Sequence, residues 1–193
     1  FFHHAGGSQA ALVEVLEALG RPIYVEEVRD TPGAVALVKS RVGIPWHTDH
    51  HRAESIVWLC LKQADEGGET LLLDGHVALD LLSREHREAL GRIELFEHSV
   101  FRGDGSRHPM IVRASDGRVR LYYSLWLADE LNEGPEREAY LAFGEALGCV
   151  EPHRVRLTPG AILAIDNTRM LHARTEIRGV NPRHLRRYWL AAR

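Results

Sequence analysis

Short apolar runs separated by turn residues recur along this chain, and they constrain its fold more than any other feature. The clearest run is 54–63, with IVWLCL at its centre, which predicts a strand buried on both faces. Glycine-containing turns at 64–68 and 115–117 divide it from similar runs. Many short strands with few helices favour a mainly β fold with flanking helices, a β-sandwich or jelly roll, over alternating α and β.

The other expected elements follow from the same patterns. Strands are expected at 23–28, 34–39, 69–74, 92–100, 108–114, 118–125, 153–157, 161–166 and 184–191, with turns at 31–33 and 115–117 and a loop at 101–107. The stretch between 166 and 184 is expected to be short and irregular. Helices are expected at 8–19, with Ser8 as N-cap, at 134–148, and at 75–90, with Val77, Leu81, Leu82 and Leu90 as the apolar face.

Composition narrows the class of protein. A length of 193 residues predicts a single domain spanning 1–193, and the first residue, Phe1, leaves room for a further N-terminal segment. A formal charge of −3 offers no general attraction for nucleic acid or an anionic membrane, and no apolar run approaches the roughly 18 residues of a membrane span. Cys60 and Cys149 are predicted to be reduced, buried thiols of a cytoplasmic protein. The oligomeric state is not predicted.

The stretch 45–49, PWHTD, is the first candidate for chemistry. On extended backbone His47 and Asp49 point to the same face, because side chains alternate with a period of two. One imidazole and one carboxylate on one face make up two-thirds of a 2-His-1-carboxylate triad, which holds iron(II) and leaves positions open. With 12 histidines in the chain, this pair alone is also explained by chance.

Three further motifs make chance a poorer explanation of the His47–Asp49 pair. The sequence GGET, ending at Thr70, follows His47 by 23 residues, and AIDNTRMLH ends at His172. Arg183 and Arg187 lie four residues apart near the C-terminus, on one face of an expected strand. Together these motifs resemble the iron(II)/2-oxoglutarate-dependent dioxygenases of the taurine dioxygenase and clavaminate synthase-like superfamily, from about residue 46 to residue 190.

The resemblance implies a double-stranded β-helix, or jelly roll, and a role for each motif residue. His47, Asp49 and His172 would be the metal ligands of a catalytic iron(II), which reacts with O₂ and 2-oxoglutarate. Thr70 and Arg183 would bind the distal carboxylate of the cosubstrate, for which a planar, permanently charged guanidinium is suited. Arg187 would contact an anionic group of the substrate. Related halogenases carry Gly or Ala at the position of Asp49, so a carboxylate there favours hydroxylation.

The resemblance therefore implies a hydroxylase of a small polar or anionic metabolite, an amino acid or a biosynthetic intermediate, that releases succinate and CO₂. Desaturation or cyclisation would use the same ligands. Two other classes stay open: a cupin-like metalloenzyme without 2-oxoglutarate, and a non-catalytic jelly-roll protein that binds a metal or ligand. The span of 123 residues from Asp49 to His172 is compact beside taurine dioxygenase, so the segment that covers the substrate is expected to be short.

Other residues are weighed between a structural role and a role in the site. Structural roles are favoured for His50 and His51 and for Asp166-Asn167, which is expected to form a turn. The aromatic residues are expected in the core, and the two arginines of the 101–107 loop are expected to be solvated: Trp46, Tyr122, Tyr123 and Trp126, and Arg102 and Arg107. Arg174 is equally compatible with a salt bridge at the core edge and with substrate contact.

Overall fold

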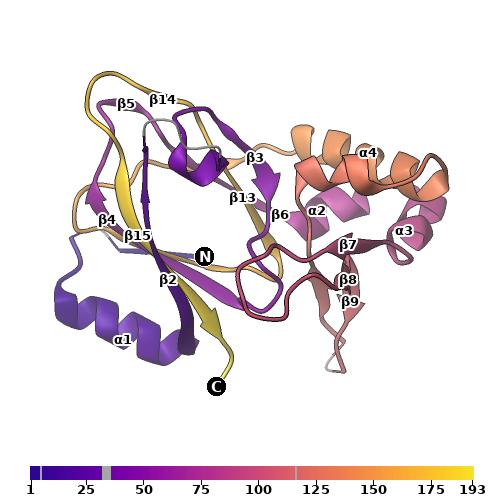
Figure 1. The fold of residues 1–193 in the computed structure, drawn as a ribbon, viewed down its shortest axis with the longest axis horizontal. Coiled ribbons are helices and arrows are strands. Elements are labelled where there is room, and N and C mark those ends of the chain that lie inside the picture. Colours follow the sequence, from indigo (N-terminus) through magenta and orange to yellow (C-terminus); the bar gives the residue numbers. More distant parts are fainter. Residues whose placement is uncertain (5, 32–35, 116) are drawn as a thin grey trace.

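The computed structural model describes residues 1–4, 6–31, 36–115 and 117–193, and their regular structure is mainly extended (Figure 1). The strands are β1 (Phe2–His4), β2 (Arg21–Arg29), β3 (Ile44–His47), β4 (Ser55–Lys62), β5 (Glu66–Gly67), β6 (Thr70–Asp74), β7 (Glu94–Phe96), β8 (Arg107–Pro109), β9 (Ile111–Arg113), β10 (Val119–Leu121), β11 (His153–Val155), β12 (Ile162–Asp166), β13 (Met170–Arg174), β14 (Ile177–Arg178) and β15 (His184–Ala191). The helices are α1 (Gln9–Leu19), α2 (Gly75–Asp80), α3 (Arg84–Leu90) and α4 (Pro135–Gly148), together with the short 3₁₀ helices η1 (Leu37–Lys39) and η2 (Leu125–Glu130).

Two antiparallel sheets form the body of the protein. The larger sheet has the order β1-β12-β4-β15-β2, and the smaller one has the order β11-β6-β13-β3. The strand order departs from the chain order, so each sheet brings together segments that lie far apart in sequence. The prediction of a mainly β fold with flanking helices is confirmed.

Side chains from both sheets share one core, so the sheets pack face to face. In β4, Ile56, Trp58 and Cys60 belong to this inner core together with Leu72 of β6 from the other sheet. The intervening Val57 points to the opposite face and packs against α1. Strand β4 is therefore buried on both faces, as its apolar sequence predicts.

Helix α1 covers the outer face of the larger sheet (Figure 1). Its buried residue Leu12 packs with Val57 and Ile162 of that sheet. The Ser8 side chain accepts a hydrogen bond from the backbone N–H of Ala11 at 3.2 Å, which satisfies one of the free N–H groups of the first turn. The prediction of this helix and of its cap is confirmed.

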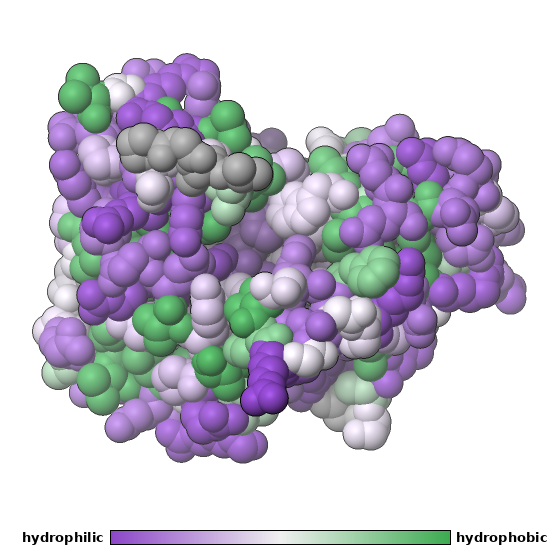
Figure 2. All heavy atoms as spheres, viewed as in Figure 1, coloured by the Kyte–Doolittle hydropathy of each residue, from purple (hydrophilic) through white to green (hydrophobic). Residues whose placement is uncertain are grey.

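A lobe of helices and short strands packs on the outer face of the smaller sheet, on the right in Figure 1. Leu73 and Leu171 of that sheet join its core, beside Tyr140 and Phe143 of α4. Strands β9 and β10 pair as the expected hairpin, although position 116 of its turn lies outside the described residues. Figure 2 shows a hollow between this lobe and the sheets.

Several predicted elements need correction. Residues 75–90 form two helices, because Ser83 caps a new helix after α2 ends, and Val77 and Leu81 of the expected apolar face are exposed. Residues 37–39 form η1 rather than a strand, and most of the expected 31–33 turn lies outside the described residues. The stretch between 166 and 184, which was expected to be irregular, contains the strand β13. Cys60 is buried, but Cys149 is exposed, and both thiols are free.

The extended segment expected at 92–100 contains only the three-residue strand β7. None of the helices in the described residues is long and apolar enough to cross a membrane.

Candidate metal centre

Strand pairing brings His47, Asp49 and His172 together. His172 of β13 lies directly opposite His47 of β3 in the smaller sheet, and their ring centroids are 4.1 Å apart. Asp49 carboxylate oxygens lie 3.9 Å from Nε2 of each histidine. One ligand atom from each of these buried side chains lies within 4.8 Å of the other two, so this donor set fits a single metal ion.

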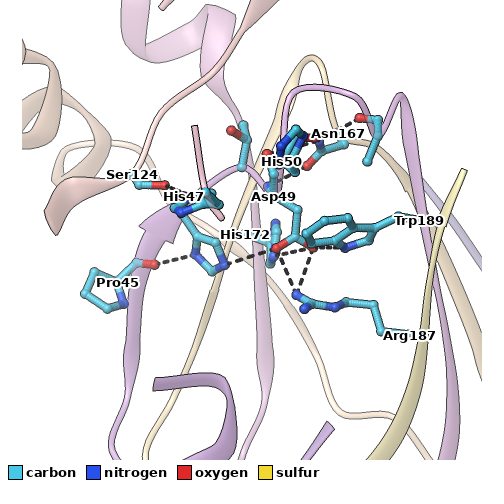
Figure 3. A network of polar contacts seen from close by, with 12 residues as sticks. Pro45, His47, Asp49, His50, Ser124, Asn167, His172, Arg187 and Trp189 are labelled. Carbon is cyan, nitrogen blue, oxygen red and sulfur yellow. Dashed lines mark hydrogen bonds and ion pairs between the residues drawn. The ribbon is translucent and has the colours of Figure 1, made fainter. Parts of the chain in front are cut away.

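Asp49 lies just beyond the end of β3, where hydrogen bonds from other segments hold the backbone (Figure 3). The Thr48 N–H donates to the Tyr123 carbonyl at 2.7 Å. The Asp49 N–H donates to Oδ1 of Asn167 at 2.8 Å, and the Asn167 amide in turn donates to the Ala53 carbonyl at 2.7 Å. Asn167 thus lies in a turn, as expected, and also holds the candidate ligand in place.

The two histidines present different hydrogen-bonding patterns. The Pro45 carbonyl can only accept, so Nδ1 of His47 donates to it at 2.8 Å and leaves Nε2 facing Asp49 (Figure 3). His172 is buried, its Nδ1 has no hydrogen-bond partner among the described residues, and its Nε2 lies 3.9 Å from Oδ2 of Asp49, too far for a hydrogen bond. A bound metal would satisfy one of these nitrogens, which supports the fit.

Burial keeps these histidines neutral, the form in which imidazole binds a metal. It lowers the pKa of His47 to about 4 and the pKa of His172 well below its ordinary value, although Asp49 opposes both shifts. Burial alone would raise the pKa of Asp49, but Arg187 and the two imidazoles outweigh it, so the pKa is lowered. The site thus combines two neutral imidazoles with one carboxylate anion.

Arg187 is paired with carboxylates of the protein itself. Its Nη1 donates to both Asp49 oxygens at 2.8 and 2.9 Å, and its Nη2 donates to Glu26 of β2 at 2.8 Å. Trp189 donates from its indole N–H to Asp49 at 2.8 Å, and the Arg187 guanidinium lies 5.0 Å from the Trp189 ring centroid. The sequence analysis missed Trp189 and Glu26; Trp189 follows Arg187 by two residues on the same strand face, which is the signal that points to it.

Thr70 and Arg183 meet beside the metal centre. Arg183 Nη2 donates to Thr70 Oγ1 at 2.7 Å, and Arg183 forms no ion pair with any described residue. Burial, and next the nearby Arg174, lower the pKa of Arg183 to about 9. A buried guanidinium without a carboxylate partner is costly, so this position suits an incoming anion.

The glycine pair before Thr70 allows the chain to pass close to Arg183 and to its neighbouring strand. Both residues have positive φ, 68° at Gly67 and 66° at Gly68. A Cβ on Gly67 would lie 2.0 Å from the Glu176 carbonyl oxygen, and one on Gly68 would lie 3.2 Å from Cδ of Arg183. These contacts give the GGET motif a physical reason.

Two cavities meet at the metal centre. A small one of about 40 Å³ is lined by Thr70 and Arg183, and a larger cleft of about 530 Å³ is lined by Glu26 and Trp126. Val38, Ile44, His47 and Arg187 border both cavities.

The remaining weighed residues have mainly structural positions. His50 is fully buried, and its Nε2 lies 3.3 Å from Oδ2 of Asp104. Nε2 of His51 lies 2.5 Å from Oε1 of Glu97. Both imidazoles are therefore directed at carboxylates other than Asp49. Arg102 and Arg107 are exposed. Of the aromatic residues, Tyr122 and Tyr123 are core and Trp46 packs against the core, whereas Trp126 lines the cleft, against expectation. Arg174 contacts backbone carbonyls, with no salt bridge to the described residues.

Comparison with known proteins identifies the family. The family described as "Taurine catabolism dioxygenase TauD, TfdA family" matches residues 5–189. The chain belongs to the TauD/TfdA family. The resemblance noted from the motifs is thereby confirmed.

Similar solved structures support the fold. Asparagine oxygenase in complex with Fe(II), 2S,3S-3-hydroxyasparagine and succinate matches with a TM-score of 0.78 and 20% identity, over 94% of this chain and 64% of that one. The non-heme iron oxygenase OrfP, with Fe and α-ketoglutaric acid, matches with a TM-score of 0.74 and 18% identity, over 96% of this chain and 64% of that one. PvcB of Pseudomonas aeruginosa matches with a TM-score of 0.68 and 20% identity, over 98% and 73%. The chain thus spans slightly less than two-thirds of the first two proteins.

Proposed function

We propose that this TauD/TfdA-family chain is an iron(II)- and 2-oxoglutarate-dependent oxygenase that hydroxylates a small polar metabolite, foremost an amino acid. The observation that carries the proposal is that two members of the metal cluster, His47 and His172, line the same small cavity as the Thr70–Arg183 pair. Either feature alone fits other classes of protein. A cupin-like enzyme without 2-oxoglutarate or a metal-storage protein has no use for the buried guanidinium of Arg183.

Each residue has a distinct role in this proposal. His47, Asp49 and His172 would hold the iron, and Thr70 and Arg183 would bind the distal carboxylate of 2-oxoglutarate. The bound iron, with 2-oxoglutarate and O₂, supplies the oxidising chemistry, and the cosubstrate leaves as succinate and CO₂. The protein orients the reactants and limits the entry of water through the burial of all three ligands.

The larger cleft is the proposed substrate site, because it reaches the same His47 and Asp49 from another side. Asparagine oxygenase and OrfP were solved with hydroxylated amino acids, hydroxyasparagine and (3S)-hydroxy-L-Arg, which supports amino acids as the first class to test. Arg187 remains the proposed substrate contact, but through a guanidinium already shared by Asp49 and Glu26. An anionic substrate group would therefore compete with Glu26 for Nη2.

We further propose that the two sheets form a jelly roll and that residues 1–193 act as one oxygenase domain. The shared core between the sheets supports both points. The pair of free thiols agrees with a reducing, cytoplasmic environment.

The test begins without substrate. Anaerobic addition of iron(II) and then 2-oxoglutarate to the metal-free protein is expected to produce a visible charge-transfer absorption band. Arg183→Met is expected to abolish the band at concentrations that saturate the wild type, whereas Arg178→Met, at an exposed arginine, leaves it unchanged. Succinate release is then measured with the twenty common L-amino acids under air. Absence of the band in the wild type would contradict the proposal.

A further inference from the structure

One wall of the substrate cleft is an irregular segment rather than a strand. Residues 36–42 contain η1, and Leu37 and Val38 of this segment line the cleft, Val38 bordering the small cavity as well. Two backbone hydrogen bonds tie this segment to others, from the Thr31 N–H to the Lys39 carbonyl and from the Ile177 N–H to the Arg41 carbonyl, both at 2.8 Å. The carbonyls of Ser40 and Val42 accept instead from a side chain of another segment.

Arg174 supplies such contacts. Its Nη2 donates to the carbonyls of Ser40 at 2.7 Å and Val42 at 2.6 Å, with longer contacts of 3.5 Å from the guanidinium to the carbonyls of Leu37 and Val38. The Ser40 and Val42 carbonyls lie beyond η1, where acceptors have no partner within the helix, whereas the Leu37 carbonyl also accepts from the Ser40 N–H at 3.1 Å. A planar guanidinium reaches several of them at once, as a lysine ammonium does not.

Arg174 itself is held by the sheet. It lies on β13 two residues after His172, opposite Thr70 of β6 on one side and Ile44 of β3 on the other. It is buried, forms no ion pair with the described residues, and burial lowers its pKa to about 10. The strand that carries a candidate iron ligand therefore also carries the residue that contacts the cleft wall.

We propose that Arg174 is a positioning residue that fixes the 36–42 wall against the strand bearing His172 and thereby sets the shape of the substrate cleft. The wall's own contacts include the Arg41 side chain on the Gly179 carbonyl, at 2.5 Å, and Lys39 on Glu26, at 3.3 Å. Both of these are on exposed side chains, so water competes with them, whereas the Arg174 contacts are buried. Arg174 thus supplies buried side-chain hydrogen bonds to the wall, beside the two backbone hydrogen bonds from Thr31 and Ile177.

Hydrogen–deuterium exchange of the metal-free protein tests this role without any assumption about activity. The amides of Lys39 and Ser40 are hydrogen-bonded within the segment and report on its opening. In Arg174→Met they are expected to exchange at least about tenfold faster, since charged hydrogen bonds are lost. Arg174→Lys is expected to be intermediate, and the exposed Arg178→Met to match the wild type. Unchanged exchange at these amides, or equal acceleration throughout β13, would overturn the proposal.

A second measurement addresses the consequence for turnover, which rests on the proposed function. With an amino acid that the wild type hydroxylates, Arg174→Met is expected to raise the substrate KM more than it lowers kcat, and to consume more 2-oxoglutarate per hydroxylated product. A fall in kcat at unchanged KM would contradict the assignment to the cleft wall. The exchange experiment gives the same answer even if the protein proves to have no oxygenase activity, so the two proposals fail separately.

Discussion

The two cavities that meet at His47 are built from different kinds of backbone. The small cavity is lined by residues of paired strands, Thr70 on β6 and His172 on β13, and by Arg183 directly before β15. The larger cleft takes much of its lining from segments outside the two sheets, 36–38, 98–100 and Trp126 of η2. The proposed cosubstrate chemistry therefore rests on strand register, whereas the shape of the proposed substrate site rests on loops.

This difference predicts that substitutions on the strand side damage metal and cosubstrate binding, while substitutions on the loop side change selectivity. The exchange experiment on Arg174 probes the boundary between them. Four further measurements test the comparison.

The largest effect is expected for Asp49→Ala. The change removes a proposed ligand and leaves the buried Arg187 without one of its two carboxylate partners. Iron(II) affinity should fall by more than about 100-fold, the upper range seen when an outer-shell partner of a ligand is lost. Isothermal titration of the metal-free protein measures it, and Asp166→Ala, at an exposed aspartate, serves as control. Retained affinity in Asp49→Ala would remove this residue from the metal site.

A somewhat smaller effect is expected for Arg183→Met. The loss of a buried guanidinium that binds a carboxylate costs about 2–5 kcal/mol, so the dissociation constant of 2-oxoglutarate should rise by roughly 100-fold. Iron(II) affinity should stay within a few-fold of the wild type, because Arg183 donates to Thr70 and not to the three ligands. Equal losses of iron and 2-oxoglutarate affinity would show that the strand side responds as one unit and not as two subsites.

The pH dependence of stability distinguishes the two regions in the metal-free protein. Burial lowers the pKa of His47 to about 4 from an ordinary value of 6.5, so between these values the unfolded chain binds more protons than the folded one. Stability should therefore fall as the pH drops from 6.5 towards 4, by on the order of 2 kcal/mol from this residue. Urea unfolding at pH 7 and pH 5 should show a weaker dependence for His47→Gln.

His98, which lines the larger cleft, provides the residue with which His47 is compared. Burial lowers its pKa too, without a large shift. His98→Gln should therefore keep most of the wild-type pH dependence. If His98→Gln flattened the curve as much as His47→Gln does, the cleft wall would be as tightly coupled to folding as the strands.

The smallest effect is expected for Glu26→Gln, on the cleft side. Glu26 accepts from Arg187 at 2.8 Å and from Lys39 at 3.3 Å, so its neutralisation leaves both cations available to an anionic substrate. Acidic L-amino acids should gain up to about tenfold in kcat/KM relative to neutral ones, as expected from the Lys39–Glu26 pair, in which the Lys39 side chain is partly exposed. Competition assays with paired substrates measure this ratio. Weakened iron(II) binding instead would place Glu26 with the metal centre.

Motifs in the sequence, together with the family resemblance, were enough to predict the residues that carry the proposed chemistry. His47 and Asp49 are two residues apart, Thr70 follows a glycine pair with positive φ by two residues, and Arg183 lies just before an amphipathic strand. The residues that hold them in place could not be predicted in this way. Asn167 holds the Asp49 N–H across 118 residues, and no local signal in either segment specifies that pairing.

The errors in the expected elements have related causes. Strand β13 has only five residues and carries the polar side chains of His172 and Arg174, which point into the protein and hide its apolar alternation. The segment 37–39 contains strand-forming residues but forms a 3₁₀ helix, whose carbonyls accept from the backbone N–H groups of Ser40 and Thr31 and, at 3.5 Å, from Arg174. In both cases tertiary contacts outweigh local propensity.

The motif at His47–Asp49, the glycine pair, His172 and the two arginines Arg183 and Arg187 were enough to predict the family and, through that resemblance, the donors proposed for a metal and a carboxylate. Only the tertiary structure decided which partners those charges have. Strand pairing places Arg187 against Asp49 and Glu26, whereas Arg183 has no anionic partner in the part of the chain that the structure describes. The reason is that a side chain's charge is written in the sequence, whereas its partners depend on register between strands that are more than 100 residues apart.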